Sequence, residues 1–395
     1  MVTLLTKYKE IKMKKLISFV IALIMILAIG AMVGCNDNNS AGSNNGETGL
    51  VYELVKDVEN GNYYTVKKLN VSEEDSKKIN DDDYEDIMID LQIPATYGDD
   101  NLPVTKIETE AFKNQKLIKT VTIPSTIKEI GAGAFTGCVN IEKMTLPFIG
   151  EKVDAKNEKK VFGHLFGTET ADGLTEAKQR YDANSETTKS YYVPTKLTHV
   201  VFSGVDGNYN LPEYAFNGCT LLEKIELNAN TTIIPRMAFA DCIALKTYTL
   251  PANVETISYY AFEGCTGLIK FNFNDVITTI EQNAFEGCTY LNSEVALVLP
   301  STLTSLGEEA FKGCSSLKGI DLSKITASGF TIKANTFNNC VNLVSAKFAN
   351  GQNIEALAFS KCTKLEASGV ENLSNCTYVV GDATTPGSFS FDYYN

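Results

Sequence analysis

Cysteine is the residue whose number and spacing could carry the most chemistry in this chain of 395 residues. Eight of the ten cysteines stand three residues after a phenylalanine, namely Cys138, Cys219, Cys242, Cys265, Cys288, Cys314, Cys340 and Cys362. Outside the cytoplasm such residues could form disulfides. In a stack of parallel strands, however, equivalent Cβ atoms point the same way and stay about 5 Å apart, beyond the roughly 3.5–4.5 Å that a disulfide needs. Metal binding would need thiolates at spacings such as Cys-x-x-Cys, which the sequence lacks. We therefore expect free thiols that pack as small apolar side chains.

The two histidines and one acidic run are the other residues that could do chemistry. His164 and His199 belong to no Ser/His/Asp or Cys/His arrangement that the sequence supports, and they form no metal-binding pair. Residues 81–86 read DDDYED, but this run lacks the glycine and the final glutamate of an EF-hand loop, which favours a solvated turn over a calcium site. No phosphate-binding glycine pattern occurs either. We therefore expect no enzyme, no catalytic residue, no cofactor and no metal.

Cys35 stands apart from the other cysteines because it ends an apolar segment. Residues 13–35 begin with a charged stretch, continue with an apolar run and end in MVGC, which resembles a lipobox and implies a lipid on Cys35. We predict a signal peptide at residues 1–34, with Met13 as the true start. The alternative is an uncleaved helical anchor with a coincidental cysteine. The lipidated cysteine and a polar tether without a large apolar residue would occupy residues 35–49.

A repeat sets the positions of the other cysteines, and its period predicts the elements that carry them. The clearest copies place phenylalanines 23 residues apart, each after an alanine and five residues after a leucine or isoleucine. Ten positions follow the pattern: Phe112, Phe135, Phe166, Phe216, Phe239, Phe262, Phe285, Phe311, Phe337 and Phe359. A period in the twenties predicts a solenoid, and alternating apolar residues predict one short strand in each coil. The predicted fold is an α/β repeat solenoid, mainly β, in a single array of about ten coils with a parallel β face.

The written-out unit AFEGCTGLIKFNFNDVITTIEQNAF, which begins at Ala261, resembles the BspA-like leucine-rich repeat family of bacterial surface proteins. The resemblance covers roughly residues 85–370. It implies a leucine-rich-repeat fold and a location at the cell surface, but it names no ligand. We place an N-terminal cap at residues 50–100, the solenoid at residues 101–372, and a C-terminal cap or tail at residues 373–395, since the ends of an array need a polar cover.

Two irregularities mark where a partner could bind. The outward positions of the strands are mostly polar, but His199 and Val201 interrupt them, and Ala296 and Val298 form a second apolar pair in a coil with three extra residues. A longer insertion, at residues 167–192, concentrates the aromatic and arginine side chains that favour binding. The candidate binding residues are Arg180, Tyr181, Tyr191, Tyr192, His199 and Val201. The alternative is that the insertion only decorates the array, because long surface insertions cost little stability.

Charge and composition narrow the class of partner. The formal net charge is −13 and the only arginines are Arg180 and Arg236, so the chain lacks the basic surface that nucleic acid requires. An anionic membrane would repel it as well, and the lipid alone would hold it there. We therefore predict a lipid-anchored surface protein of the adhesin type that binds a host or bacterial protein or glycan. The alternative is a structural display scaffold or antigen without a dedicated ligand. The sequence predicts no oligomeric state.

Overall fold

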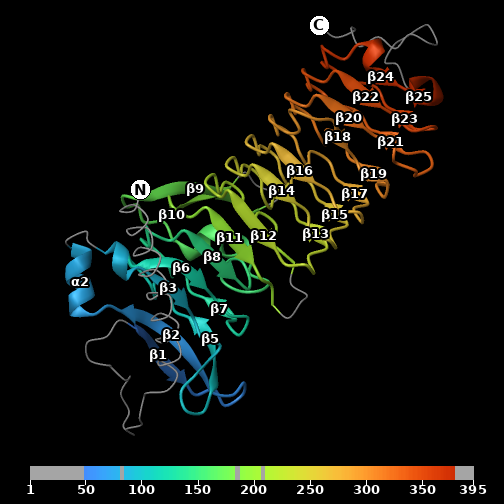
Figure 1. Ribbon diagram of the computed structural model, residues 1–395. Coiled ribbons are helices and arrows are strands. Elements are labelled where there is room, and N and C mark those ends of the chain that lie inside the picture. The colour runs from blue at the N-terminus through green and yellow to red at the C-terminus, as the bar shows by residue number, and fades with distance from the viewer. Residues whose placement is uncertain (1–48, 81–83, 183–186, 206–209, 379–395) are drawn as a thin grey trace, which may run out of the picture. The chain divides into compact units, whose positions relative to one another are not determined.

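The computed structural model describes residues 49–80, 84–182, 187–205 and 210–378 (Figure 1). Cys35, the signal segment before it and residues 379–395 lie outside the described residues. Contact clustering separates the chain into Met1–Gly42 and Ser43–Asn395, and every described residue belongs to the second unit. This unit is a parallel β-solenoid of about eleven turns with little helix, which confirms the predicted fold class.

Each coil contributes a strand to a first ladder, whose outward surface is called the strand face below. Its strands are β3 (Ile89–Gln92), β6 (Ile118–Thr122), β8 (Lys143–Leu146), β11 (His199–Phe202), β12 (Lys224–Leu227), β14 (Thr247–Thr249), β16 (Lys270–Asn272), β18 (Leu297–Val298), β20 (Gly319–Asp321), β22 (Ser345–Lys347) and β24 (Val370–Glu371). The strands pair in parallel within three groups, β3 to β12, β14 with β16, and β18 to β24. Among the described residues, the ladder is therefore interrupted between β12 and β14 and again between β16 and β18.

A second ladder of shorter strands runs along the array on another side of the coils. It comprises β5 (Leu102–Ile107), β7 (Glu129–Ile130), β13 (Ile233–Ile234), β15 (Thr256–Ile257), β17 (Thr279–Ile280), β19 (Ser305–Leu306), β21 (Thr331–Ile332), β23 (Asn353–Ile354) and β25 (Thr377–Tyr378). From β13 to β19 this ladder is continuous and parallel. Neighbouring coils therefore stay paired here at the same level where β16 and β18 separate.

The first coil is covered by an antiparallel hairpin of β1 (Gly49–Val55) and β2 (Tyr63–Asn70). Strand β2 then pairs in parallel with β5, while β4 (Thr96–Tyr97) pairs antiparallel to β5. The rings of Tyr52 and Tyr97 stack with centroids 3.8 Å apart, and Tyr64 meets Tyr97 edge-on. Helix α2 (Glu73–Asn80) is the one α-helix among the described residues, and 3-10 turns follow at Glu85–Ile87, Asn157–Lys159, Phe162–Leu165, Ala367–Gly369 and Leu373–Asn375.

The repeated phenylalanines form a column of rings through the core. In the regular coils, successive rings stack with centroids 5.0–5.9 Å apart and planes within 4–19°. The backbone N–H of each of these phenylalanines up to Phe337 donates to the carbonyl that precedes the next coil's phenylalanine, at 2.8–2.9 Å. Gly218, Gly264 and their equivalents take φ values of +66° to +73° in the turn after the ring, a conformation that glycine adopts without strain.

The predicted cysteine ladder is confirmed as free and buried. The structure adds a reason for cysteine that the sequence did not show. In seven coils, the Sγ donates to the carbonyl oxygen of the preceding coil's phenylalanine at 2.9–3.3 Å. Burial raises the pKa of Cys138 to about 12 and also raises the pKa of Cys219 and Cys314. These thiols therefore stay protonated. In the seven coils, the Sγ is a second donor to a phenylalanine carbonyl that also accepts a main-chain N–H within its own coil.

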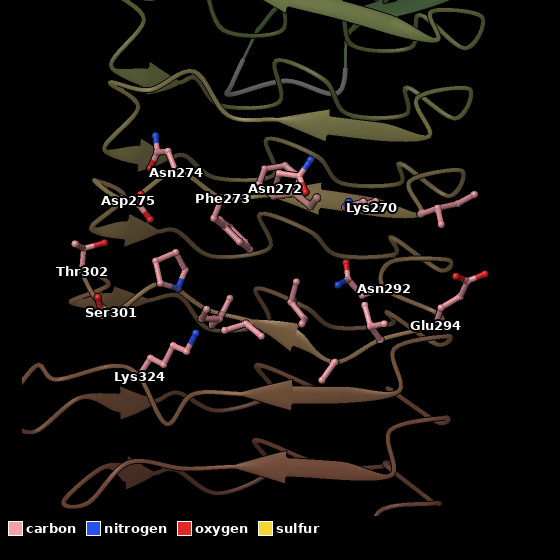
Figure 2. A pocket seen from close by; sticks show the side chains of 18 residues that line it. Lys270, Asn272, Phe273, Asn274, Asp275, Asn292, Glu294, Ser301, Thr302 and Lys324 are labelled. Atoms are coloured by element: carbon pink, nitrogen blue, oxygen red, sulfur yellow. The ribbon is translucent and has the colours of Figure 1, made fainter.

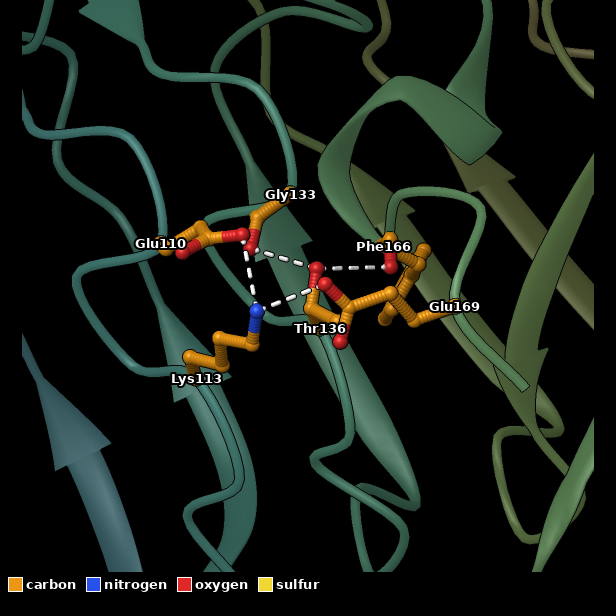
Figure 3. Close-up of polar contacts among 6 residues, drawn as sticks. All are labelled: Glu110, Lys113, Gly133, Thr136, Phe166 and Glu169. Carbon is orange, nitrogen blue, oxygen red and sulfur yellow. Dashed lines mark hydrogen bonds and ion pairs between the residues drawn. The ribbon is translucent and has the colours of Figure 1, made fainter. Parts of the chain in front are cut away.

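The insertion folds as an antiparallel hairpin of β9 (Leu174–Arg180) and β10 (Thr188–Pro194). At its upstream end, the Thr136 hydroxyl is shared between the carbonyls of Gly133 and Phe166 at 2.8 and 2.9 Å (Figure 3). Lys113 reaches Glu110 at 3.0 Å and Glu169 at 2.6 Å in the same view. The first residues of the insertion are therefore tied to the two coils that precede it.

The coil that carries the insertion uses two phenylalanines where other coils use one. The column of rings passes from Phe135 to Phe166 at 6.4 Å, to Phe162 at 5.2 Å and on to Phe216 at 5.3 Å. Phe162, not Phe166, donates its backbone N–H to the carbonyl of Ala215 in the next coil. The array thus remains continuous across the irregular coil.

Gln179, on β9, replaces main-chain hydrogen bonds that the irregular coil cannot make. Its side chain is wholly buried. Its Oε1 accepts from the Gly163 N–H at 2.6 Å, and its Nε2 donates to the carbonyl of Asn217 at 2.9 Å. Its Nε2 also lies 3.7 Å from the Sγ of Cys219, the one ladder cysteine that does not donate in the regular way. The hairpin is therefore part of the core packing and not a loop appended outside it.

Candidate binding surface

The strand face is mostly a regular polar surface, and several of its charged side chains are paired with one another. Lys224 contacts Glu226 at 2.6 Å within β12, and Lys347 on β22 contacts Glu371 on β24 at 3.0 Å. Thr120 donates to Asp90 at 2.7 Å between β6 and β3. Such exposed pairs contribute little free energy, and they offer a partner no desolvated anchor.

His199 and Val201, two of the predicted binding residues, lie on β11 in the continuous part of the first ladder. The Nε2 of His199 lies 2.7 Å from the Oε1 of Glu226. Partial burial, followed by the charges of Lys143 and Lys224, lowers the pKa of His199, although Glu226 opposes this shift. The imidazole is therefore neutral at pH 7 and already engaged with its neighbour on the sheet.

The predicted binding residues of the insertion have different environments. Arg180 is exposed. Burial raises the pKa of Asp241 and of Glu263 in the turns of two later coils, and the Arg180 guanidinium opposes this shift. Tyr181 is half-buried and packs against the cluster that contains Tyr191. Tyr191 is buried, its hydroxyl donates to the Glu158 carbonyl at 2.8 Å, and burial raises its pKa.

Tyr192 is half-buried, with its N–H bonded to the carbonyl of Gly167. Tyr191, by contrast, is buried, so it packs in the core and is not presented at the surface. The neighbours of Arg180 are turn residues, whereas those of His199 are residues of the strand face. The structure does not bring the six predicted residues together into one site.

A groove opens on the strand face at the interruption between β16 and β18 (Figure 2). Its volume is about 600 Å³, within the usual range for ligand sites. It is lined by residues 269–275, 292, 294–302 and 324, and it is called the strand-face groove below. Figure 2 shows β16 and β18 lying farther apart than the strands on either side of them.

A three-residue excess in one coil produces this groove. Leu268 is followed by the buried strand residue Phe271 after three positions, whereas Leu291 is followed by its equivalent Leu297 only after six. The additional residues form turns and bends before β18, and the strand then no longer pairs with β16. The sequence signal was visible as the extra length and as the pair Ala296 and Val298, but neither predicts an open groove.

Apolar side chains are exposed along the groove. Ile269 is 45 % exposed, Val295 65 % and Val298 41 %. Phe273 is half-buried, and its ring packs against Phe271 with centroids 4.7 Å apart. Exposed apolar side chains that line one hollow are typical of an interaction site.

Polar groups of the groove are placed at its two ends. Asn292 and Glu294 lie toward one end, and Asp275, Thr302 and Lys324 lie toward the other (Figure 2). Asn292 is only 9 % exposed, and its Oδ1 is buried without a hydrogen-bond partner. Its backbone is fixed, because its N–H donates to the Ile269 carbonyl at 2.9 Å. A buried amide oxygen without a donor costs about 1–3 kcal/mol, and a bound donor would recover that free energy.

The comparisons with known proteins agree on one kind of repeat. A family model described as the BspA type leucine rich repeat region matches residues 99–157, 186–296 and 293–381, in six copies. No curated protein matches the chain. In the described residues, no helix has the length and apolar character needed to cross a bilayer.

Solved structures of similar proteins include a leucine-rich repeat protein from Bacteroides ovatus, with 20 % identity over 85 % of this chain and 78 % of that chain and a TM-score of 0.45. A second is described as a leucine rich cell surface protein from Faecalibacterium prausnitzii, with 19 % identity over 88 % of this chain and 97 % of that chain and a TM-score of 0.28. A third is a leucine-rich repeat protein from Eubacterium ventriosum, with 15 % identity over 84 % of this chain and 82 % of that chain and a TM-score of 0.34.

Proposed function

Because the chain belongs to the BspA-type leucine-rich repeat family, we propose that it is a recognition protein of the bacterial cell surface. In this proposal, a lipid on Cys35 holds the chain at the membrane, and the solenoid binds a protein or glycan partner without catalysing a reaction. The observation that carries the proposal is the strand-face groove, an open hollow with exposed apolar side chains in an otherwise mostly polar face. Repeat proteins typically bind their partners through an extended surface of this kind.

Binding can be tested with the chain from Ser43 onward, which contains the whole described core. We expect this protein to bind saturably to at least one member of arrays that carry extracellular proteins, bacterial surface polymers and glycans. A variant that lacks residues 293–295 should lose this binding, because the shortened coil has the regular spacing and can pair β18 with β16. The matched control lacks residues 327–329, which lie in the extra length between Leu322 and Ile332 of the next coil and outside the groove.

The outcomes separate the two functions. Saturable binding that only the first deletion abolishes supports recognition through the groove. If no protein, polymer or glycan on these test arrays binds saturably, the result would support a display scaffold. The ion pairs of the strand face favour that function, because they leave few charged groups for a partner. Binding that survives both deletions would keep the recognition function but move its site away from the groove.

The lipid anchor has its own test. Replacing Cys35 by alanine in the full chain should abolish metabolic labelling with a palmitate analogue, because the proposed diacylglycerol is attached through the Cys35 thiol. The matched control is Cys376→Ala, which removes a half-buried thiol at the other end of the array and should leave the labelling unchanged. Labelling that persists in Cys35→Ala would refute the anchor without affecting the binding proposal.

A further inference from the structure

We infer that the strand-face groove binds an extended peptide segment of a partner protein, which adds as a strand between β16 and β18. This inference rests on the proposed function and specifies the chemical class of its partner. Three observations carry it: two facing strand edges, a buried amide oxygen without a donor, and the pattern of apolar and charged side chains along the groove.

The two edges of the interrupted ladder supply the main-chain groups. Within the described residues, β16 pairs with β14 alone and β18 pairs with β20 alone, so each presents its other edge to the groove. A strand edge without a neighbour is a ready template for another chain, and proteins that bind peptides by strand addition use such edges. The second ladder stays paired through β17 and β19 at this level, so the coils are held in place while the groove remains open.

Asn292 indicates where a donor from the peptide would be satisfied. Among the side chains that line the groove, its Oδ1 is the one buried atom without a partner. The residue lies at one end of the groove between the two strands (Figure 2). A backbone N–H of an added strand is a donor of the right kind for this oxygen, once the side-chain amide rotates to present it to the groove. The nearby Asn274 shows the contrast, because its side chain already donates to the carbonyls of Pro251 and Val254 and accepts two backbone N–H groups.

The side chains favour a peptide over a glycan. Ile269, Val295 and Val298 are exposed along the groove and can contact alternate side chains of an extended segment. Sugars are usually bound by stacking on an open aromatic face, but the only aromatic residues that line the groove are Phe271 and Phe273, and Phe271 is buried. The ring of Phe273 is also occupied by Phe271 at 4.7 Å and by Phe285 at 6.2 Å.

Charge complementarity specifies the ends of the segment. Lys270 and Glu294 lie toward one end of the groove, and Asp275 and Lys324 lie toward the other (Figure 2). Neither lysine is within 4.0 Å of a carboxylate in the part of the chain that the structure describes. The matching segment is therefore apolar in its middle and charged at both ends.

The test uses a random linear peptide library displayed on phage and panned against the chain from Ser43 onward. We expect enriched peptides with alternating apolar residues between charged ends. Val298→Asp should weaken their binding at least about tenfold, which corresponds to about 1.4 kcal/mol. The matched control is Val344→Asp, because Val344 has a similar exposed fraction, 46 %, but lies outside the groove.

N-methylation of an enriched peptide at alternate residues should weaken its binding by a similar factor, since it removes N–H donors from the added strand.

Each outcome decides the inference separately from the proposed function. Enriched peptides that tolerate N-methylation in both registers would show that main-chain pairing is not used, and the inference would fail. The inference also fails if panning enriches no peptide while a glycan array shows binding that deletion of residues 293–295 abolishes, although recognition through the groove would then stand. If no array, library or polymer gives saturable binding, both the inference and the proposed function fail.

Discussion

Replacing Gln179 by alanine should lower the free energy of unfolding by about 2–5 kcal/mol. The substitution removes the acceptor of the Gly163 N–H and the donor to the Asn217 carbonyl. It leaves both groups buried in a site where the described residues of the irregular coil offer no other partner. Each unsatisfied buried group costs about 1–3 kcal/mol. Urea unfolding followed by circular dichroism measures the change.

Two further variants test the reason for that loss. Lys178→Ala is the matched control, because Lys178 precedes Gln179 on β9 but its side chain is exposed, so its stability should stay within about 0.5 kcal/mol of the parent protein. Gln179→Glu keeps the acceptor but places a buried carboxyl beside the Asn217 carbonyl, which raises the pKa of that carboxyl in the folded state. Relative to the parent protein, its stability should therefore be highest in acid and fall as the pH rises through the folded-state pKa of this carboxyl. A Gln179→Ala protein as stable as the control would show that the hairpin only decorates the array.

Replacing Phe262 by alanine should cost about 3–5 kcal/mol, because it opens a cavity in the middle of the column of rings. The Phe262 ring stacks on Phe239 and Phe285 at 5.1 and 5.3 Å, and it meets Tyr248 and Phe271 at 5.1 and 5.2 Å. Coils contact only their neighbours, so the loss should first appear as faster hydrogen exchange in the coils on either side.

The matched control for the ring is Tyr259→Ala, three residues earlier in the same coil. Tyr259 is 46 % exposed, so its removal should change the stability by no more than about 0.5 kcal/mol. Equal losses from the two substitutions would mean that the column of rings does not carry the stability of the coil. Uniform acceleration of exchange along the whole array would instead mean that the solenoid unfolds as one unit.

The regular part of the fold could be predicted from the sequence because equivalent positions of successive coils carry the same kind of residue, so each coil can be compared with the others. Phenylalanine and cysteine recur at a fixed spacing, and the structure buries them together. The irregular coil offered no such comparison. Phe162 could not be recognised as a second ring, and Gln179 is a polar residue whose role depends on carbonyls 36 and 38 residues away in the sequence.

The candidate site was harder to predict for a related reason. Tyr191 looked like a binding anchor because aromatic residues in insertions often are, but the pairing of β10 with β9 places it in the core. The groove follows from three additional residues whose number can be read from the sequence. Their effect on the ladder depends on the turn that those residues form, and no other coil in the described part of the chain has the same turn for comparison.

The hydrogen bonds between regular coils also determine how such an array can change its length during evolution. Between Phe216 and Phe359, every junction uses the same phenylalanine N–H and the same cysteine thiol, so one coil can follow another without a special partner. Duplication or loss of a whole coil in this segment recreates a satisfied junction. The coil that depends on Gln179 has no such freedom, because a second copy would need a second hairpin in the same register. Length variation among descendants of this gene should therefore accumulate on the C-terminal side of the hairpin, in steps of one coil.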